Sequence, residues 1–240
     1  MAKSILYGIG VGPGDPELIT VKAIETIRKC QVAAAPRTPG GGTLALDIVR
    51  QAVDLEGKKV LLLDFAMSPD ADKRRASHRA AAESVRHELD AGNAVALLNL
   101  GDVSVFSSFR YIADILGPEG YDIRMIPGVP SFCAAAARMG ASLTDMANPL
   151  YIIPDGDGKA TMPPADDGVT VYMKSGKHLQ ELLARLRECG RLDDAVLVQN
   201  CGLPDETIDT APTETAVEKR YFSLVVVRPR RNSWNKAGTK

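Results

Sequence analysis

The sequence has few of the features that mark secreted, metal-binding or membrane proteins. Its four cysteines are widely scattered and form no CxxC pair, so we expect neither a disulfide framework nor a zinc site, but buried free thiols in a reducing compartment. The three histidines have no HExxH or other metal-ligand spacing. The apolar run at residues 5–11 is broken by glycines, and no apolar run reaches the roughly 18 residues of a membrane span. We therefore expect a cytoplasmic protein with no membrane contact and no protein-bound metal.

The sequence also has few aromatic residues and almost no net charge. Aromatic residues make up 5% of the chain and the formal net charge is -1. Surfaces that bind nucleic acid usually combine a basic face with aromatic side chains for stacking, so we expect no nucleic-acid partner. With 45% hydrophobic and 25% charged residues, the composition is that of an ordinary globular protein. A chain of 240 residues can bury a sizeable core, in one large domain or two small ones.

The first half of the chain alternates short apolar runs with longer amphipathic ones. Strands are predicted at residues 4–10, 31–35, 59–65, 94–100 and 121–126. Helices are predicted between them at residues 16–29, 43–53, 70–91 and 106–116. Strands that alternate with helices pair in parallel and are covered on both faces. The fold class is therefore α/β, with a mostly parallel five-stranded sheet in this half.

The pattern changes after Pro127 and Gly128. A helix of small residues is predicted at 131–139, and a loop rich in Gly, Pro and Asp at 155–168. Strands are predicted at 150–153, 169–173, 195–199 and 222–228, around a helix at 177–189. Strands without a helix between each pair indicate a mixed sheet. We predict two α/β domains, residues 1–128 and 129–240, with a polar, frayed end at 230–240.

A glycine-rich segment, GIGVGPGD at residues 8–15, lies between the first strand and the first helix. It is not a dinucleotide fingerprint, because Pro13 and Asp15 stand where GxGxxG requires glycine. Asp15 would also repel a pyrophosphate at the helix start. Two interpretations remain open: the loop lets a ligand approach the backbone closely, or its glycines only allow a tight turn.

Two further motifs follow strands of the same sheet. LGDVSVF, residues 100–106, follows the fourth strand, so this loop and the glycine-rich segment leave the same sheet edge, where α/β proteins bind ligands. Asp102 in it is either part of a site or the cap of the next helix. IPGVPS, residues 126–131, precedes the alanines at 134–137. Those alanines allow close packing of another helix or of a flat ligand.

Taken together and in this order, the motifs GxGPGDPELIT, LGDxxxF and IPGVxS resemble those of the tetrapyrrole methylase family. The resemblance runs through nearly the whole chain. It implies two α/β domains with S-adenosylmethionine (SAM) in the cleft between them, and a homodimer. FAMS at residues 65–68 and YFSLV at residues 221–225 resemble the branch that methylates C-20 of precorrin-2 or cobalt-factor II in cobalamin biosynthesis. The sequence leaves open whether that substrate carries cobalt.

The resemblance also implies site residues. The implied SAM contacts are Pro13, Gly101, Asp102, Val103, Phe106, Pro130, Ser131, Met173 and Cys201. Several of these contacts come from backbone groups. The sequence departs from the family where Val103 replaces a usual proline, Pro130 a usual serine or threonine, and Ala66 a usual proline. Pro130 removes a hydroxyl and a backbone donor that could have held SAM.

Methyl transfer from SAM depends mainly on alignment, although a base is useful for removing the proton of the methylated carbon afterwards. Asp102 and the nearby tyrosines are the candidates for that base. A flat substrate ringed by carboxylates needs an apolar trough with arginines at its rim. Arg37, Arg74 and Arg75 are the predicted substrate contacts. The cations at residues 73–79 are either a solvated helix face or a carboxylate site that offsets their position near a helix N-terminus.

Other functions are compatible with the same motifs. A methylase of another tetrapyrrole position would share them. Relatives of this fold also methylate ribose in ribosomal RNA, although the low aromatic content and near-zero charge argue against an RNA substrate. A relative that binds SAM without turnover is a further alternative, which the departures at Val103 and Pro130 favour.

Overall fold

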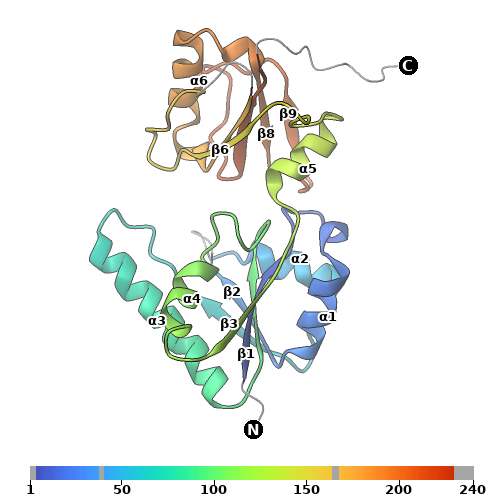
Figure 1. Cartoon of the computed structure of the whole chain (residues 1–240), viewed down its shortest axis with the longest axis vertical. Helices are drawn as coiled ribbons and strands as arrows, with labels where there is room; N and C mark the ends of the chain where they lie inside the picture. Colours follow the sequence, from blue (N-terminus) through green and yellow to red (C-terminus); the bar gives the residue numbers. More distant parts are fainter. Residues whose placement is uncertain (1–3, 38–40, 164–167, 230–240) are drawn as a thin grey trace. The chain divides into compact units, whose positions relative to one another are not determined.

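The structure is a computed structural model that describes residues 4–37, 41–163 and 168–229. The chain divides into two compact units, Met1–Ser131 and Phe132–Lys240, and each contains one sheet (Figure 1). Across the described ranges, no helix is both long enough and apolar enough to cross a membrane. The predicted frayed end at residues 230–240 lies outside the described residues.

The first unit is built on a five-stranded sheet in the order β3-β2-β4-β1-β5. Every neighbouring pair of strands in this sheet is parallel. This confirms the predicted sheet. The strands are β1 (Ile5–Gly10), β2 (Val32–Pro36), β3 (Lys59–Leu63), β4 (Val95–Asn99) and β5 (Asp122–Ile126), and the helices are α1 (Val21–Lys29), α2 (Leu44–Ala52), α3 (Ala71–Asp90) and α4 (Phe109–Leu116).

Helices cover both faces of this sheet, as Figure 1 shows, with α1 and α2 on one side and α3 and α4 on the other. Successive strand residues point to opposite faces, so Leu98 of β4 packs in the α1–α2 core and Leu97 in the α3–α4 core. Both leucines are fully buried. Burial on both faces explains why these strands are continuous apolar runs in the sequence.

The predicted helix at residues 16–29 is wrong in one respect, because the structure divides it. A 3₁₀ turn (Pro16–Leu18) is capped by Asp15, whose side chain accepts a hydrogen bond from the backbone N–H of Glu17. The chain is then extended at Ile19 and Thr20. The Thr20 hydroxyl accepts a hydrogen bond from the Ala23 N–H and starts α1 afresh. The apolar spacing across residues 18–27 hid this second cap.

The predicted helix at residues 106–116 starts later than expected. Phe106 has a φ of 49°, a left-handed conformation that cannot belong to a right-handed helix. The helix α4 therefore begins at Phe109, whose N–H donates a hydrogen bond to Ser107 Oγ at 3.1 Å. Residues 100–108 form a longer loop than predicted.

The second unit is built on a five-stranded sheet in the order β6-β7-β10-β8-β9. Its β6 and β7 are parallel and its other pairs are antiparallel, which confirms the mixed sheet. The prediction missed β9, an exposed strand of three residues without an apolar run. The strands are β6 (Leu150–Pro154), β7 (Val169–Met173), β8 (Ala195–Gln199), β9 (Thr207–Asp209) and β10 (Ser223–Val227), and the helices are α5 (Ser131–Arg138) and α6 (Leu179–Glu188).

One face of this second sheet is covered by α6. Leu179, Leu182, Leu183 and Leu186 are fully buried against Val225 and other strand residues. All four cysteines are free thiols, and Cys30 and Cys201 are buried as predicted. The prediction of burial is wrong for Cys133, which is exposed, and for Cys189, which is only partly buried. Cys133 lies in α5 between the buried residues Phe132 and Ala134, on the outer side of a helix whose other face is apolar.

Candidate functional site

Three loops that carry the sequence motifs leave the same edge of the first sheet. In the parallel register, Gly10 of β1 pairs with Asn99 of β4, and Ile9 pairs with Ile126 of β5. The loops at residues 11–15, 100–108 and 127–130 therefore start side by side. This is the edge where α/β sheets bind ligands.

Glycines bring these loops into direct backbone contact. A Cβ added to Gly128 would lie 2.4 Å from the carbonyl oxygen of Gly101, and one added to Gly10 would lie 2.6 Å from the backbone nitrogen of Gly128. A Cβ on Gly8 would lie 2.6 Å from the ring of Phe109. Steric demand thus accounts for Gly8 and Gly10, one of the two interpretations left open by the sequence.

The first two loops are also joined by hydrogen bonds. The Gly101 N–H donates to the Gly12 carbonyl at 2.7 Å, and the Gly12 N–H donates to the Gly101 carbonyl at 3.2 Å. Gly12 and Gly101 have φ values of 77° and 74°, which residues with a side chain rarely adopt. Glycine at these positions therefore sets the path of the backbone.

Asp102 fastens the third loop to the second. One carboxylate oxygen accepts the Gly128 N–H at 2.8 Å, and the other accepts the Ser104 N–H at 2.8 Å as well as the Ser104 hydroxyl. Burial raises the pKa of Asp102, but these hydrogen bonds outweigh burial and hold the pKa below its ordinary value. The interpretation of Asp102 as the cap of the next helix is wrong, because Ser107 bonds the first N–H of α4.

This geometry bears on the predicted role of Asp102 as a base. Both carboxylate oxygens already accept hydrogen bonds, and Asp102 as a whole is 8% exposed. A carboxylate with a lowered pKa is a weak proton acceptor. The catalytic role of Asp102 remains a prediction, whereas its contacts are those of a residue that positions two loops.

The other predicted contacts of the first unit lie around this edge. Val103 is 3% exposed and its side chain packs in the same core as Phe109, away from any ligand. Phe106 is 43% exposed. A Cβ on Gly101 would lie 3.9 Å from both Pro130 Cα and Ser131 N, which places those residues against the second loop. Pro13 is buried in the first loop.

In the second unit, Met173 and Cys201 lie at one edge of the mixed sheet. Met173 pairs with Leu224, and Ser223 pairs with Gln199. The ends of β7 and β8 and the start of β10 therefore meet at this edge. Met173 is the last residue of β7, and Cys201 follows β8 by two positions.

Residues with a strained backbone lie at or next to predicted SAM contacts in both units. Among the described residues, those with a side chain and a positive φ are Phe106, Lys174 and Asn200, at 49°, 64° and 52°. Each is itself a predicted SAM contact or is adjacent in sequence to one. Such conformations cost about 1 to 3 kcal/mol each and cluster at functional sites.

Cys201 is not a nucleophile in this structure. Burial, followed by the negative charge of Glu206, raises its pKa to about 11, so the thiol is neutral at physiological pH. Glu206 also accepts the Gly202 N–H at 2.6 Å and lies 3.5 Å from the guanidinium of Arg138. These contacts hold the turn after β8, and contact of Cys201 with SAM remains a prediction.

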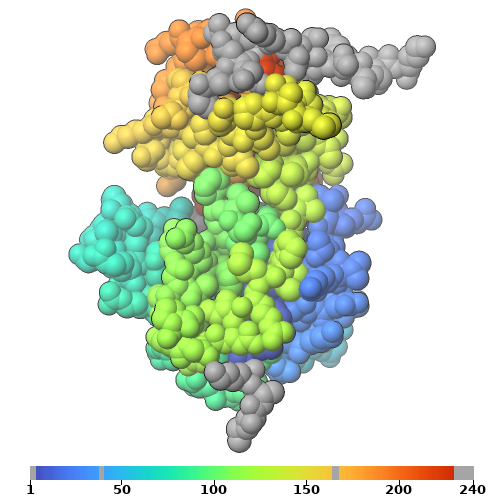
Figure 2. Space-filling view, in the orientation of Figure 1, coloured from blue at the N-terminus to red at the C-terminus, as the bar shows by residue number. Residues whose placement is uncertain are grey.

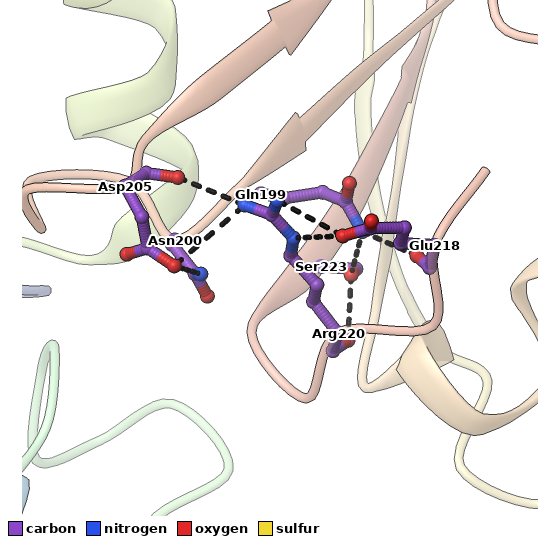
Figure 3. Close-up of polar contacts among 6 residues, drawn as sticks. All are labelled: Gln199, Asn200, Asp205, Glu218, Arg220 and Ser223. Carbon is purple, nitrogen blue, oxygen red and sulfur yellow. Dashed lines mark hydrogen bonds and ion pairs between the residues drawn. The ribbon is translucent and has the colours of Figure 1, made fainter.

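A polar network that sequence analysis missed fastens residues 200–222 to this edge (Figure 3). The buried Gln199 donates to the Glu218 carbonyl and to Ser223 Oγ, both at 2.9 Å. Arg220 pairs with the Glu218 carboxylate at 3.0 Å and donates to the Asp205 carbonyl at 2.9 Å. The sequence did carry one indication of this network, because a polar residue stands at one end of each of two otherwise apolar strands, Gln199 on β8 and Ser223 on β10.

Ser175 lies two residues beyond the end of β7 and is fully buried. Its hydroxyl oxygen has no hydrogen-bond partner. A buried hydroxyl without a partner costs about 1 to 3 kcal/mol, so it is a place where a ligand group can supply the missing bond.

Comparison with known proteins identifies the family. The family model described as Tetrapyrrole (Corrin/Porphyrin) Methylases matches residues 5–217. The chain belongs to the tetrapyrrole methylase family. The cobalt-precorrin-2 C(20)-methyltransferase of Salmonella typhimurium is 32% identical, over 92% of this chain and 95% of that protein. The precorrin-2 C(20)-methyltransferase of a Sinorhizobium species is 30% identical, over 92% of this chain and 94% of that protein.

Solved structures of other methylases share the fold. An X-ray structure of a cobalt precorrin-4 methyltransferase has a TM-score of 0.70 at 22% identity, covering 93% of this chain and 94% of that one. The uroporphyrin-III C-methyltransferase of Thermus thermophilus, complexed with S-adenosylhomocysteine, has a TM-score of 0.66 at 21% identity, covering 94% of this chain and 92% of that one.

The predicted substrate arginines of this methylase lie after β2 and in the first turns of α3. Arg37 follows β2, and its Nε lies 3.3 Å from the carboxylate of Asp64. Arg74 donates to the carbonyls of Ser68 and Pro69 at 2.6 and 2.7 Å. Arg75 is ion-paired with Asp72 on α3. Arg74 thus holds the segment before α3 in place. Contact of the three arginines with the substrate remains a prediction.

No metal site stands out in the part of the chain that the structure describes. There, no group of three or more His, Cys, Asp or Glu side chains is arranged to hold a metal ion.

Proposed function

We propose that this tetrapyrrole methylase transfers a methyl group from SAM to C-20 of precorrin-2 or of its cobalt-containing counterpart, in cobalamin biosynthesis. One observation carries the proposal: the relatives from Salmonella and Sinorhizobium, both named for this reaction, match over more than nine-tenths of both chains. The FAMS and YFSLV segments, which resemble the same branch, support it.

Residues in each of the two units support SAM as the methyl donor. SAM carries an amino acid, a ribose and an adenine, all of which need hydrogen-bond partners when buried. The unpaired hydroxyl of Ser175 is one such partner, next to the predicted contact Met173. In the first unit, the predicted contacts Gly101, Asp102 and Pro130 lie on loops that are locked together.

When bound, the donor supplies a methyl group on a positively charged sulfur, which is already activated for transfer. The protein's contribution is to hold both reactants in line and to keep water out. The backbone contacts among Gly10, Gly101 and Gly128, together with the Asp102 carboxylate, fix the loop positions before binding. Such preorganised loops lose little conformational entropy when a ligand binds.

We also propose that the enzyme is a cytoplasmic homodimer with no nucleic-acid partner and no resident metal. The family resemblance supports the dimer, and the near-zero net charge supports the absence of nucleic acid. Light scattering measures the oligomeric state: a molar mass near twice 25.7 kDa is expected, and a monomer at micromolar concentration would contradict it.

A methyl-transfer assay tests the function. Purified protein is incubated with methyl-labelled SAM and, in parallel, metal-free precorrin-2 or cobalt-factor II, and the product mass and the labelled carbon are determined. One added methyl group at C-20 is the expected result, and the preferred substrate assigns the metal state. Transfer to another ring carbon, or none while SAM still binds by calorimetry, would overturn the proposal.

A further inference from the structure

A small aromatic cluster outside the motif loops joins segments of the first unit that are far apart in sequence. The His78 ring of α3 stacks on the Tyr111 ring of α4, with ring centroids 4.0 Å apart and planes within 10°. The Phe65 ring is tilted by 52° against the His78 ring, with the ring centroids 5.9 Å apart. Phe65 follows β3 and opens the FAMS segment. The cluster therefore lies where β3 and β4 end.

Hydrogen bonds hold the FAMS segment against α3. The Ala66 N–H donates to Ser77 Oγ at 3.0 Å. The Arg74 guanidinium donates to the carbonyls of Ser68 and Pro69. The segment thus approaches α3 in a defined conformation, and Phe65 is placed beside His78 by these bonds rather than by burial alone.

The cluster is only partly buried, and the segments that follow β3 and β4 carry exposed large apolar side chains. Tyr111 is 47% exposed, Met67 is 61% exposed and Phe106 is 43% exposed. They belong to the segments that follow β3 and β4, at the edge that holds the motif loops. Figure 2 shows the start of α3, in teal, reaching the surface beside the green segment around α4. Exposed apolar side chains that gather next to a ligand edge mark a binding surface.

Cations of α3 lie close in sequence to this cluster. Lys73, Arg75 and Arg79 are exposed on the first three turns of the helix, and positive charge at its start opposes the helix dipole. Asp72 pairs with Arg75, and Asp70 caps the helix. Together with Arg74 this leaves an excess of positive charge, which is complementary to a ligand that carries several carboxylates.

We propose that Phe65, His78 and Tyr111 form a platform for the flat ring system of the tetrapyrrole, whose carboxylates are bound by the cations of α3. This inference rests on the proposed function and deepens it, because it names the residues that recognise the substrate. Burial and the neighbouring charge of Arg74 lower the pKa of His78. The imidazole is therefore uncharged at neutral pH, and it acts as a planar contact rather than as a partner for a carboxylate.

Substrate binding by single variants tests the platform. Precorrin-2 is titrated into the protein saturated with S-adenosylhomocysteine, and binding is followed by visible absorbance. Since stacking on an aromatic ring contributes about 1 kcal/mol, Tyr111→Ala and His78→Ala are each expected to raise the substrate Kd about five- to tenfold. Tyr111→Phe and His78→Phe keep a ring and are expected to stay within about twofold of the wild type.

Tyr121→Ala is the matched control. Tyr121 precedes β5, at the opposite edge of the same sheet, and its hydroxyl donates to Asp90 at 2.6 Å. Its removal is expected to leave the substrate Kd unchanged. Thermal unfolding and calorimetric binding of S-adenosylhomocysteine establish that each variant is folded. The alanine variants lose the His78–Tyr111 stack and are expected to unfold a few degrees below the wild type, whereas their affinity for S-adenosylhomocysteine is expected to match it.

The outcomes separate this inference from the function it rests on. If the wild type methylates precorrin-2 at C-20 but Tyr111→Ala and His78→Ala bind it as tightly as the wild type, the platform is wrong and the function stands. If only the alanine variants lose substrate affinity while S-adenosylhomocysteine binding is kept, the platform is supported. If the wild type neither binds nor methylates precorrin-2 or cobalt-factor II, both proposals fall.

Discussion

The two sheets fasten their ligand-edge loops by different means. In the parallel sheet, β1, β4 and β5 all end at one edge, and the loops that follow touch through the backbones of Gly10, Gly101 and Gly128. In the mixed sheet, β10 starts where β7 and β8 end. The long connection at residues 200–222 is held there by side chains, chiefly Gln199 and Arg220 (Figure 3).

The difference follows from strand direction. Neighbouring parallel strands end at the same edge of the sheet, so the loops that follow them start side by side. Glycines then allow these loops to pack backbone against backbone. An antiparallel neighbour at the same edge belongs to a segment that arrives from elsewhere in the chain, and side-chain hydrogen bonds must hold it. We therefore expect the first edge to be sensitive to added volume and the second to lost hydrogen bonds.

The largest effect is expected from Gly128→Ala. The new Cβ would lie 2.4 Å from the Gly101 carbonyl oxygen and 2.7 Å from the Gly10 carbonyl carbon, so the backbone must move. We expect a loss of about 3 kcal/mol in the free energy of unfolding, measured with urea. Gly156→Ala is the control, because its nearest atom lies 3.9 Å away and its effect should stay within about 1 kcal/mol. Equal losses in both variants would contradict the packing argument.

Asp102→Asn should break the link between the second and third loops. An amide can accept at one end only, so its NH₂ group must face the Gly128 N–H or the Ser104 donors. We expect a loss of about 2 kcal/mol at pH 7 in urea unfolding.

The same substitution has a pH signature. Because the folded pKa of Asp102 is lowered, its stabilising contribution is present above the unfolded pKa of about 4 and is lost as the pH falls through the folded value. The stability difference between wild type and Asp102→Asn should therefore narrow as the pH is lowered below about 4. A difference that stays constant there would show that the charge is not involved.

Gln199→Leu probes the second edge. It removes the bonds to the Glu218 carbonyl and to Ser223 Oγ inside a buried setting, and we expect a loss of about 1.5 kcal/mol in urea unfolding. Gln51→Leu removes one exposed bond to the Asp47 carbonyl and should change stability by no more than about 0.5 kcal/mol. A similar loss of stability in the two variants would contradict the view that the buried hydrogen bonds of Gln199 hold the second edge.

Ser175→Ala should separate ligand binding from stability. The Ser175 hydroxyl has no hydrogen-bond partner in the folded protein, so its removal should not lower the free energy of unfolding. The variant loses a hydrogen bond to SAM, however, which should raise the Kd for SAM about fivefold by calorimetry. Thr170→Val removes another unpaired buried hydroxyl, within β7, and should leave SAM affinity unchanged. If SAM affinity falls in neither variant, Ser175 does not contact the donor.

Local sequence patterns predicted most helices and strands, because the residues that an element buries must be apolar and therefore recur at the spacing of that element. The buried strands β1, β4 and β8 read directly as apolar runs. The failures lie where one residue overrides a periodic pattern. Thr20 caps α1 separately from the 3₁₀ turn before it, and Phe106 adopts a left-handed conformation that no apolar spacing reveals. The strand β9 is too short and too exposed to show a pattern.

By itself, the sequence determined the α/β class, the parallel and mixed sheets, and the family, because periodicity and ordered motifs are properties of the chain. Only the tertiary structure decided what the motif residues do. Gly128 is needed because of the carbonyl of Gly101, and Asp102 serves a backbone N–H 26 positions away. His78 stacks on Tyr111 because α3 and α4 cover the same face of the sheet. Contacts between distant segments depend on packing in three dimensions, which no local pattern records.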